Sequence, residues 1–139
     1  MTTQTVLIVE DEKDIRELLA FNCAREGFAV LEAGDGDSAV RLAGEKKPDV
    51  ILLDLMLPGM DGLSVCKALQ RDERTAAIPV IMLTARGEEV DRIVGLELGA
   101  ADYVVKPFST REVMLRIRAV LKRNAPGTGL ASLRCGEIR

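Results

Sequence analysis

Five short apolar runs, each followed by a stretch with helical spacing, constrain the fold of this chain more than any other feature. The runs are residues 5–9, 28–33, 49–53, 79–84 and 102–105. Four of them are nearly continuous in apolar and β-branched residues, as in strands covered on both faces, whereas 28–33 is more mixed and suits a sheet edge. The alternation predicts an α/β fold of five βα units, with a doubly wound parallel sheet and helices on both of its faces.

Capping residues and glycines indicate where some of the helices begin and end. Asp37 or Ser38 is predicted to cap the second helix, and Gly44 lies near its expected end. Ser109 is predicted to cap the fifth helix in a capping box with Glu112, three residues further on.

Composition excludes several classes of protein. A chain of 139 residues fits one domain with its own core, and its net charge of −3 gives no general electrostatic case for nucleic-acid binding. It has no histidine, which rules out His-ligated metals and Ser–His–Asp triads within the chain. Its three cysteines, Cys23, Cys66 and Cys135, are too widely spaced to suggest a disulfide or metal framework. With no signal-peptide pattern and no run of transmembrane length, we expect a cytoplasmic protein that does not enter a membrane.

Polar residues stand where four of the apolar runs end. Glu10 and Asp11 follow the first run, Asp54 follows the third, the fourth ends on Thr84, and the fifth leads into Lys106. Parallel strands end at one edge of their sheet, where ligands bind, so these side chains are expected to converge. Clustered acids need a cation between them, and ligands that are all oxygen favour Mg²⁺. The arrangement predicts a phosphoryl-transfer site in which an ionised carboxylate acts as the nucleophile.

Four motifs, "LIVEDE", "DVILLDLMLPGMDG", "IPVIMLTA" and "GAADYVVKPF", resemble the receiver domain of two-component response regulators over about residues 6–123. The resemblance implies a flavodoxin-like, CheY-like fold with strand order 2-1-3-4-5. It also implies that Asp54 accepts a phosphoryl group from a histidine of a sensor kinase. Such a domain is a phosphoacceptor with slow autodephosphorylation rather than an enzyme acting on other molecules.

The same resemblance assigns roles to the residues of the site. The expected Mg²⁺ ligands are Glu10, Asp11, Asp54 and the main-chain carbonyl of Met56. Lys106 is expected to contact the phosphoryl group and to precede a cis peptide bond to Pro107. Thr84 and Tyr103 are the expected switch pair.

Residues 91–123 are similar to the OmpR/PhoB class of transcription factors, in which this face forms a symmetric dimer on phosphorylation. Carried over by position, the ion pairs are Arg92 with Glu112, Glu97 with Arg118 and Asp102 with Arg116, around an apolar centre of Ile93, Leu96 and Leu115. Two positions depart from the class: Ala101 replaces a common Asp, and Leu115 is larger than the usual Ala. Local pairs on solvated helix faces are the alternative account of these charges.

The expected domain organisation is a receiver domain over 1–123, a linker over 124–132, and in 133–139 the first strand of a winged-helix domain. DNA binding would belong to elements beyond residue 139. A stand-alone receiver that acts through protein contacts is one alternative. An aspartate-based phosphotransferase is another, although such enzymes carry a second acid where this chain has Met56. A nucleotide or flavin module is disfavoured because 33–39 lacks a phosphate-binding glycine motif.

Overall fold

The computed structural model describes residues 3–85, 93 and 96–123. Five strands form one sheet in the order β2-β1-β3-β4-β5, and all four neighbouring pairs are parallel. The strands are β1 (Thr5–Val9), β2 (Ala29–Ala33), β3 (Val50–Asp54), β4 (Val80–Ala85) and β5 (Asp102–Lys106). The predicted doubly wound sheet is confirmed, with the mixed run of β2 at an edge.

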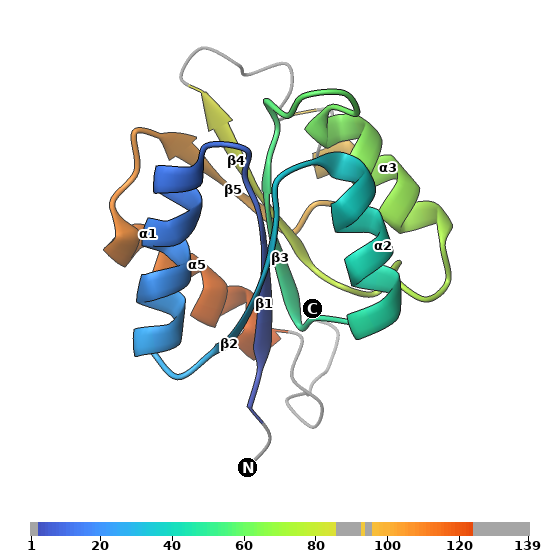
Figure 1. Ribbon diagram of the computed structural model, residues 1–139. Coiled ribbons are helices and arrows are strands. Elements are labelled where there is room, and N and C mark those ends of the chain that lie inside the picture. The colour runs from blue at the N-terminus through green and yellow to red at the C-terminus, as the bar shows by residue number, and fades with distance from the viewer. Residues whose placement is uncertain (1–2, 86–92, 94–95, 124–139) are drawn as a thin grey trace.

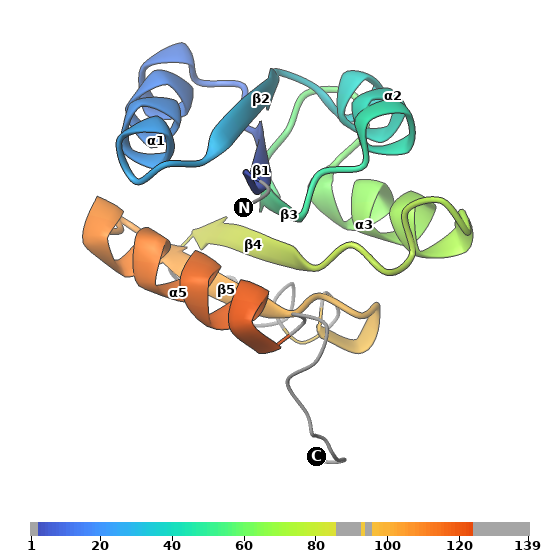
Figure 2. The same cartoon turned by 90° about the horizontal axis from the view of Figure 1, so that it is seen from below.

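Helices cover both faces of the sheet. They are α1 (Lys13–Arg25), α2 (Gly36–Lys46), α3 (Gly62–Arg71) and α5 (Thr110–Arg123). Figure 1 shows α1 and α5 on one face and α2 and α3 on the other, and Figure 2 shows the same layers from below. The predicted fourth helix lies largely outside the described residues. Among the helices that are described, none combines the length and the apolar character needed to cross a membrane.

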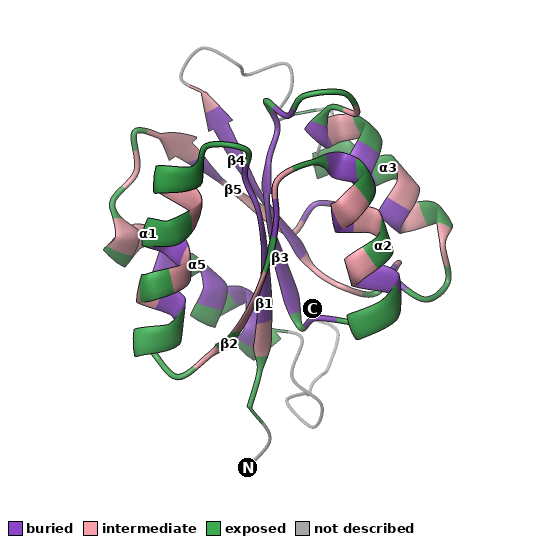
Figure 3. Cartoon of the chain, in the orientation of Figure 1, coloured by how far each residue is buried: buried purple, intermediate pink, exposed green. Residues whose placement is uncertain are grey.

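The core has two halves, one on each face of the sheet. Leu7 and Leu53 point into the half covered by α2 and α3, whereas Ile8 and Leu52 point into the half covered by α1 and α5. All five residues of β3 are buried, and Figure 3 shows the central strands buried along their length. Burial on both faces explains why these strands read as continuous apolar runs.

The structure corrects the predicted cap of α2 and confirms the serine cap of α5. Asp35, rather than Asp37 or Ser38, caps α2, and its Oδ1 accepts a hydrogen bond from Ser38 N at 2.8 Å. Two acids, Asp35 and Asp37, lie two positions apart in the sequence. Because α2 begins at Gly36, Asp35 is the cap and Asp37 lies in the first turn of the helix. The cap of α5 is confirmed on the serine side, because Ser109 Oγ accepts from Glu112 N at 3.0 Å.

Gly44 lies inside α2, near its end, and does not terminate it. The residue that follows the helix is Lys47, in a left-handed conformation with φ 48°. The missing side chain at Gly44 instead makes room for Arg74, since a Cβ atom there would lie 3.0 Å from Arg74 Nη2.

Candidate functional site

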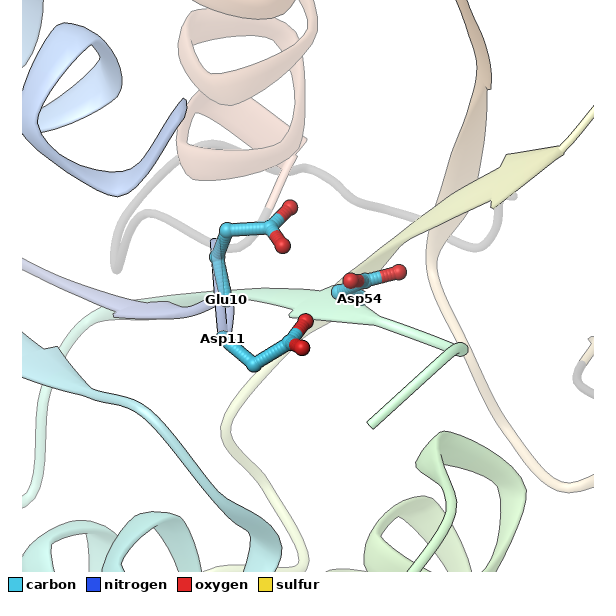
Figure 4. A group of neighbouring side chains, drawn as sticks. All are labelled: Glu10, Asp11 and Asp54. Atoms are coloured by element: carbon cyan, nitrogen blue, oxygen red, sulfur yellow. The ribbon is translucent and has the colours of Figure 1, made fainter. Parts of the chain in front are cut away.

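Three acidic side chains meet at the carboxyl edge of the sheet, as predicted. Glu10 and Asp11 directly follow β1, and Asp54 is the last residue of β3, which is paired with β1. One ligand oxygen from each lies within 4.8 Å of the other two. In Figure 4 the Glu10 and Asp11 side chains extend from the end of β1 toward Asp54. The strand pairing thus brings together acids that are far apart in the sequence.

The three acids differ in their exposure to solvent. Glu10 and Asp54 are 0% and 2% exposed, whereas Asp11 is exposed. Main-chain donors hold both buried carboxylates: Met56 N donates to Asp54 Oδ1 at 3.0 Å, and Glu12 N donates to Glu10 Oε2 at 3.1 Å. The site therefore has two fixed carboxylates at its base and a third at its mouth.

Lys106 supplies the ammonium group of the site. It is the last residue of β5, and its side chain crosses the end of β4 to reach the acids. Its Nζ lies 3.2 Å from Glu10 Oε1 and 3.3 Å from Asp54 Oδ1. The peptide bond between Lys106 and Pro107 is cis, as the resemblance implied. The ammonium thus offsets part of the repulsion between the two buried carboxylates.

The pKa values of Glu10 and Lys106 reflect burial and the closeness of the carboxylates. Burial, followed by a hydrogen bond with Asp54, raises the pKa of Glu10 to about 7. Burial acts to lower the pKa of Lys106, but the carboxylates of Asp54 and Glu10 outweigh it and raise that pKa. One ammonium against three carboxylates leaves the cluster acidic. Oxygen donors of this kind fit a hard divalent cation such as Mg²⁺.

Thr84 is buried at the same edge of the sheet as the acids. It is 0% exposed, and its Oγ1 has no hydrogen-bond partner within the part of the chain that the structure describes. An unsatisfied buried hydroxyl costs about 1–3 kcal/mol. Because Thr84 is on β4, next to the end of β3, this hydroxyl lies at the same edge of the sheet as Asp54.

Tyr103 lies near Thr84 on the neighbouring strand. It is half-buried on β5 and pairs with Met82, which precedes Thr84 by two residues on β4. Side chains alternate along a strand, so Tyr103, Met82 and Thr84 share one face of the sheet. The predicted switch pair is therefore a pair of neighbours on adjacent strands.

Charges predicted to pair across a dimer form pairs within the chain. Arg116 Nη1 lies 3.1 Å from Asp102 Oδ2, and its Nη2 lies 3.7 Å from Glu112 Oε2. Arg118 pairs with Glu26, the residue that follows α1. A dimer built on the predicted pairs would have to exchange these partners.

The predicted apolar centre of the dimer is open to solvent. Ile93, Leu96 and Leu115 are 57%, 42% and 57% exposed. Glu97 is also exposed, whereas Arg92 lies outside the described residues. Three large apolar side chains, one of them on α5, are therefore available for contact with a partner.

Arg16 is a component of the site that sequence reasoning missed. Its Nη1 donates to the main-chain oxygen of Glu10 at 2.9 Å, and its Nε donates to Glu32 Oε1 at 3.3 Å. A sequence signal existed, since Arg16 lies one turn into the helix that follows the acidic pair. Charged residues on exposed helices are common, however, so that position alone does not single it out.

An apolar pocket opens beside Lys106. Its volume is about 410 Å³, and its lining residues are Ile15, Leu18, Ala85, Lys106, Pro107 and Phe108. It lies between α1 and the segment that follows β5. No sequence pattern predicts this pocket, because its walls come from three separate parts of the chain.

The chain is similar in sequence to a known domain family and to two regulatory proteins. The family described as response regulator receiver domain matches residues 6–118. The chain is 48% identical over 138 residues to the phosphate regulon transcriptional regulatory protein PhoB of Pseudomonas aeruginosa, covering 99% of this chain and 60% of that protein. It is 54% identical over 121 residues to the protein of the same name from Escherichia coli, covering 87% of this chain and 53% of that protein. The chain thus spans little more than half the length of these relatives.

A solved structure shares the fold. The receiver domain of NtrX from Brucella abortus superposes with a TM-score of 0.79 at 30% identity, over 84% of this chain and 98% of that one. The shared fold extends over nearly all of that receiver domain.

Proposed function

Because this chain belongs to the response regulator receiver domain family, we propose that Asp54 accepts a phosphoryl group from a histidine of a sensor kinase. The observation that carries the proposal is the placement of the Asp54 carboxylate, buried at a strand end, grouped with two further carboxylates and 3.3 Å from the Lys106 ammonium. A carboxylate nucleophile needs no general base to remove a proton as it attacks. The P–O bond to Asp54 would form as the P–N bond to the kinase imidazole breaks.

Glu10, Asp11, Asp54 and the main-chain carbonyl of Met56 would hold Mg²⁺ in this site. The support is the donor set: three carboxylates whose oxygens lie within 4.8 Å of one another. Mg²⁺, when bound, would offset negative charge on the phosphoryl oxygens.

Lys106 and Thr84 would contact the phosphoryl group directly. The Lys106 ammonium already lies against Asp54 and would turn toward an added phosphoryl oxygen. Thr84 carries a buried hydroxyl without a partner among the described residues, and a phosphoryl oxygen would supply the missing acceptor. Movement of Thr84 would leave space for Tyr103, and the exposed side of β5 and α5 would change with it.

The chain would act as a phosphoacceptor with slow autodephosphorylation, not as an enzyme acting on other substrates. Met56 lies two residues after Asp54, where aspartate-based phosphotransferases carry a second acid. A thioether cannot protonate a leaving group, so this position favours a signalling role.

Phosphorylation would promote a two-fold dimer through β5, α5 and the predicted fourth helix. The exposed side chains of Ile93, Leu96 and Leu115 support this face as an interface. Arg92, the proposed partner of Glu112, lies outside the described residues, so that pair rests on the resemblance alone.

Control of transcription would follow from a DNA-binding domain after residue 139. Support comes from the curated relatives, which are named transcriptional regulatory proteins and are longer than this chain. The proposed linker, 124–132, and the proposed first strand of the DNA-binding domain, 133–139, lie outside the described residues. A cytoplasmic location would suit a protein that receives a phosphoryl group from a kinase and acts on DNA.

The proposal is tested by incubating the chain with acetyl phosphate and Mg²⁺ and measuring its intact mass. We expect one phosphoryl group on the parent chain and none on Asp54→Asn, because an amide is not a nucleophile. Asp49→Asn is the matched control, since Asp49 is exposed and directly precedes β3, at the end of the strand opposite to Asp54. EDTA should prevent the mass increase. Equal phosphorylation of Asp54→Asn and the parent would refute the proposal.

A further inference from the structure

Arg16 connects three separate parts of the edge of the sheet that carries the acids. It is on α1, it donates from Nη1 to the main-chain oxygen of Glu10 at 2.9 Å, and it pairs through Nε with Glu32 of β2 at 3.3 Å. The guanidinium group thus contacts the backbone of one proposed metal ligand while it is held by a carboxylate from the neighbouring strand. Its side chain is 22% exposed, so much of it is shielded from solvent.

The backbone of Glu10 is held from both sides. Its N–H donates to the Ala33 carbonyl at 3.0 Å, and its carbonyl accepts from Arg16. The loop is also closed by Glu12 N, which donates to Glu10 Oε2 at 3.1 Å, but Glu12, the N-cap of α1, makes no side-chain capping bond. Asp11 follows directly and has an exposed side chain, so its position depends on the backbone that Arg16 fixes.

The guanidinium group has little freedom to move away from this position. A Cβ atom at Gly34 would lie 3.2 Å from Arg16 Nη1, which shows how closely the chain after β2 approaches it. The two contacts use different nitrogens of one rigid, planar group. A lysine ammonium at this position would keep the charge but lose the fixed fork that serves both acceptors.

We propose that Arg16 is a positioning residue for the divalent-cation site, holding Glu10 and Asp11 in the arrangement that binds the ion. The inference rests on the proposed function, because it assumes that these acids hold Mg²⁺. Arg16 touches neither the ion nor the phosphoryl group in this account. It acts through the backbone of Glu10, as outer-shell groups do when they orient metal ligands.

The direction in which Mg²⁺ affinity changes when Arg16 is replaced distinguishes a positioning role from an electrostatic role. A cation close to the acids opposes the binding of a second cation, so a purely electrostatic role for Arg16 predicts tighter Mg²⁺ binding when the charge is removed. A role in stability alone predicts a lower melting temperature and an unchanged Mg²⁺ affinity of the folded chain. Positioning predicts weaker Mg²⁺ binding.

The test is calorimetric titration of Mg²⁺ into the whole chain and its Arg16→Ala variant, with circular dichroism to confirm that both are folded. We expect the variant to bind Mg²⁺ about 10-fold more weakly. The matched control is Arg74→Ala, which removes an arginine that also pairs with a carboxylate, Asp72, on the connection between α3 and β4. It should leave the affinity unchanged. Unchanged or tighter binding by Arg16→Ala would overturn the inference.

Two further variants test whether the geometry of the guanidinium group, and not only its charge, supports Mg²⁺ binding. Arg16→Lys keeps the charge and is expected to weaken Mg²⁺ binding by at least about 3-fold, because the fork is lost. Glu32→Gln removes the group that orients Arg16, so its effect on Mg²⁺ affinity should be smaller in the Arg16→Ala background than in the parent. Parent-like binding by Arg16→Lys, or additive effects in the double variant, would count against positioning.

Measurements on the parent chain distinguish a failure of the proposed function from a failure of the role of Arg16. If the parent chain neither binds Mg²⁺ nor gains a phosphoryl group, the proposed function fails, and the role of Arg16 fails with it. If the parent does both and Arg16→Ala binds Mg²⁺ equally well, only the role of Arg16 is wrong.

Discussion

Lys106 Nζ lies 3.3 Å from Asp54 Oδ1, although the two residues end strands that are not neighbours in the sheet. β4 lies between them, and only a long side chain reaches across its end. The same ammonium lies 3.2 Å from Glu10. In the absence of a metal ion, this contact joins the two buried carboxylates to a counter-charge, so the stability of the domain should depend on it.

Lys106→Ala is therefore expected to lower the free energy of unfolding of the metal-free chain by about 1–3 kcal/mol, because it leaves buried carboxylates unpaired. Mg²⁺ should restore more stability to this variant than to the parent, since the ion replaces the lost cation. Urea unfolding with EDTA and with Mg²⁺ measures both effects. Lys67→Ala, at an exposed position on α3, should change neither value. Equal behaviour of the two variants would contradict the account.

The pH dependence of stability should report the buried Glu10 carboxyl. Its pKa is about 7 in the folded chain, against an ordinary value of 4.5, so the folded state binds more protons than the unfolded state between these values. Its contribution is full below pH 4.5 and is lost as the pH rises toward and through 7. In EDTA, the parent should lose roughly 1–3 kcal/mol more stability than Glu10→Gln between pH 5 and pH 8. Parallel pH profiles of the two proteins would show that Glu10 is ionised throughout.

Two buried threonines allow a matched comparison. Thr75 Oγ1 donates to the Leu69 carbonyl at 2.7 Å, whereas the hydroxyl of Thr84 has no partner within the described residues. Thr75→Val should lower the free energy of unfolding by about 1–2 kcal/mol, whereas Thr84→Val should leave it unchanged or raise it by up to about 1 kcal/mol. Chemical denaturation measures both. A loss at Thr84→Val as large as that at Thr75→Val would mean that the Thr84 hydroxyl is already satisfied before phosphorylation.

The proposed dimer should respond to a charge placed in its apolar centre. With beryllofluoride as a mimic of the phosphoryl group, the parent is expected to dimerise, whereas Leu115→Asp should remain monomeric because the new carboxylate would be buried without a partner. Sedimentation velocity measures the association. Phe21→Asp is the control, since Phe21 is a similarly exposed apolar residue on α1. If Leu115→Asp dimerises like the parent, the interface lies elsewhere, and the pairs of Arg116 within the chain are the better account of its charges.

The sequence was sufficient to predict the sheet and the residues at its carboxyl edge, for a physical reason. Every observed strand lies within one residue of its predicted bounds, and parallel topology alone brings strand ends together. The groups that support the site were harder to predict. The hydrogen bond from Arg16 to the main-chain oxygen of Glu10 depends on the conformation of a long side chain, which the periodicity of the sequence does not reveal. Asp35 rather than Asp37 is the cap because α2 begins at Gly36, and the sequence pattern does not locate the start of a helix to within two residues. Arg118 pairs with Glu26 because α5 packs beside α1, and this contact depends on tertiary packing that no local sequence pattern predicts.

Whether Asp54 itself carries the phosphoryl group is decided by locating that group in the sequence. After incubation with acetyl phosphate and Mg²⁺, borohydride reduction converts an aspartyl phosphate to homoserine, which tandem mass spectrometry assigns to a position. Homoserine is expected at residue 54 and at no other aspartate, and none is expected when EDTA replaces Mg²⁺. Homoserine at Asp11 or at any position other than 54, with Asp54 unmodified, would contradict the assignment of the phosphoryl group to Asp54.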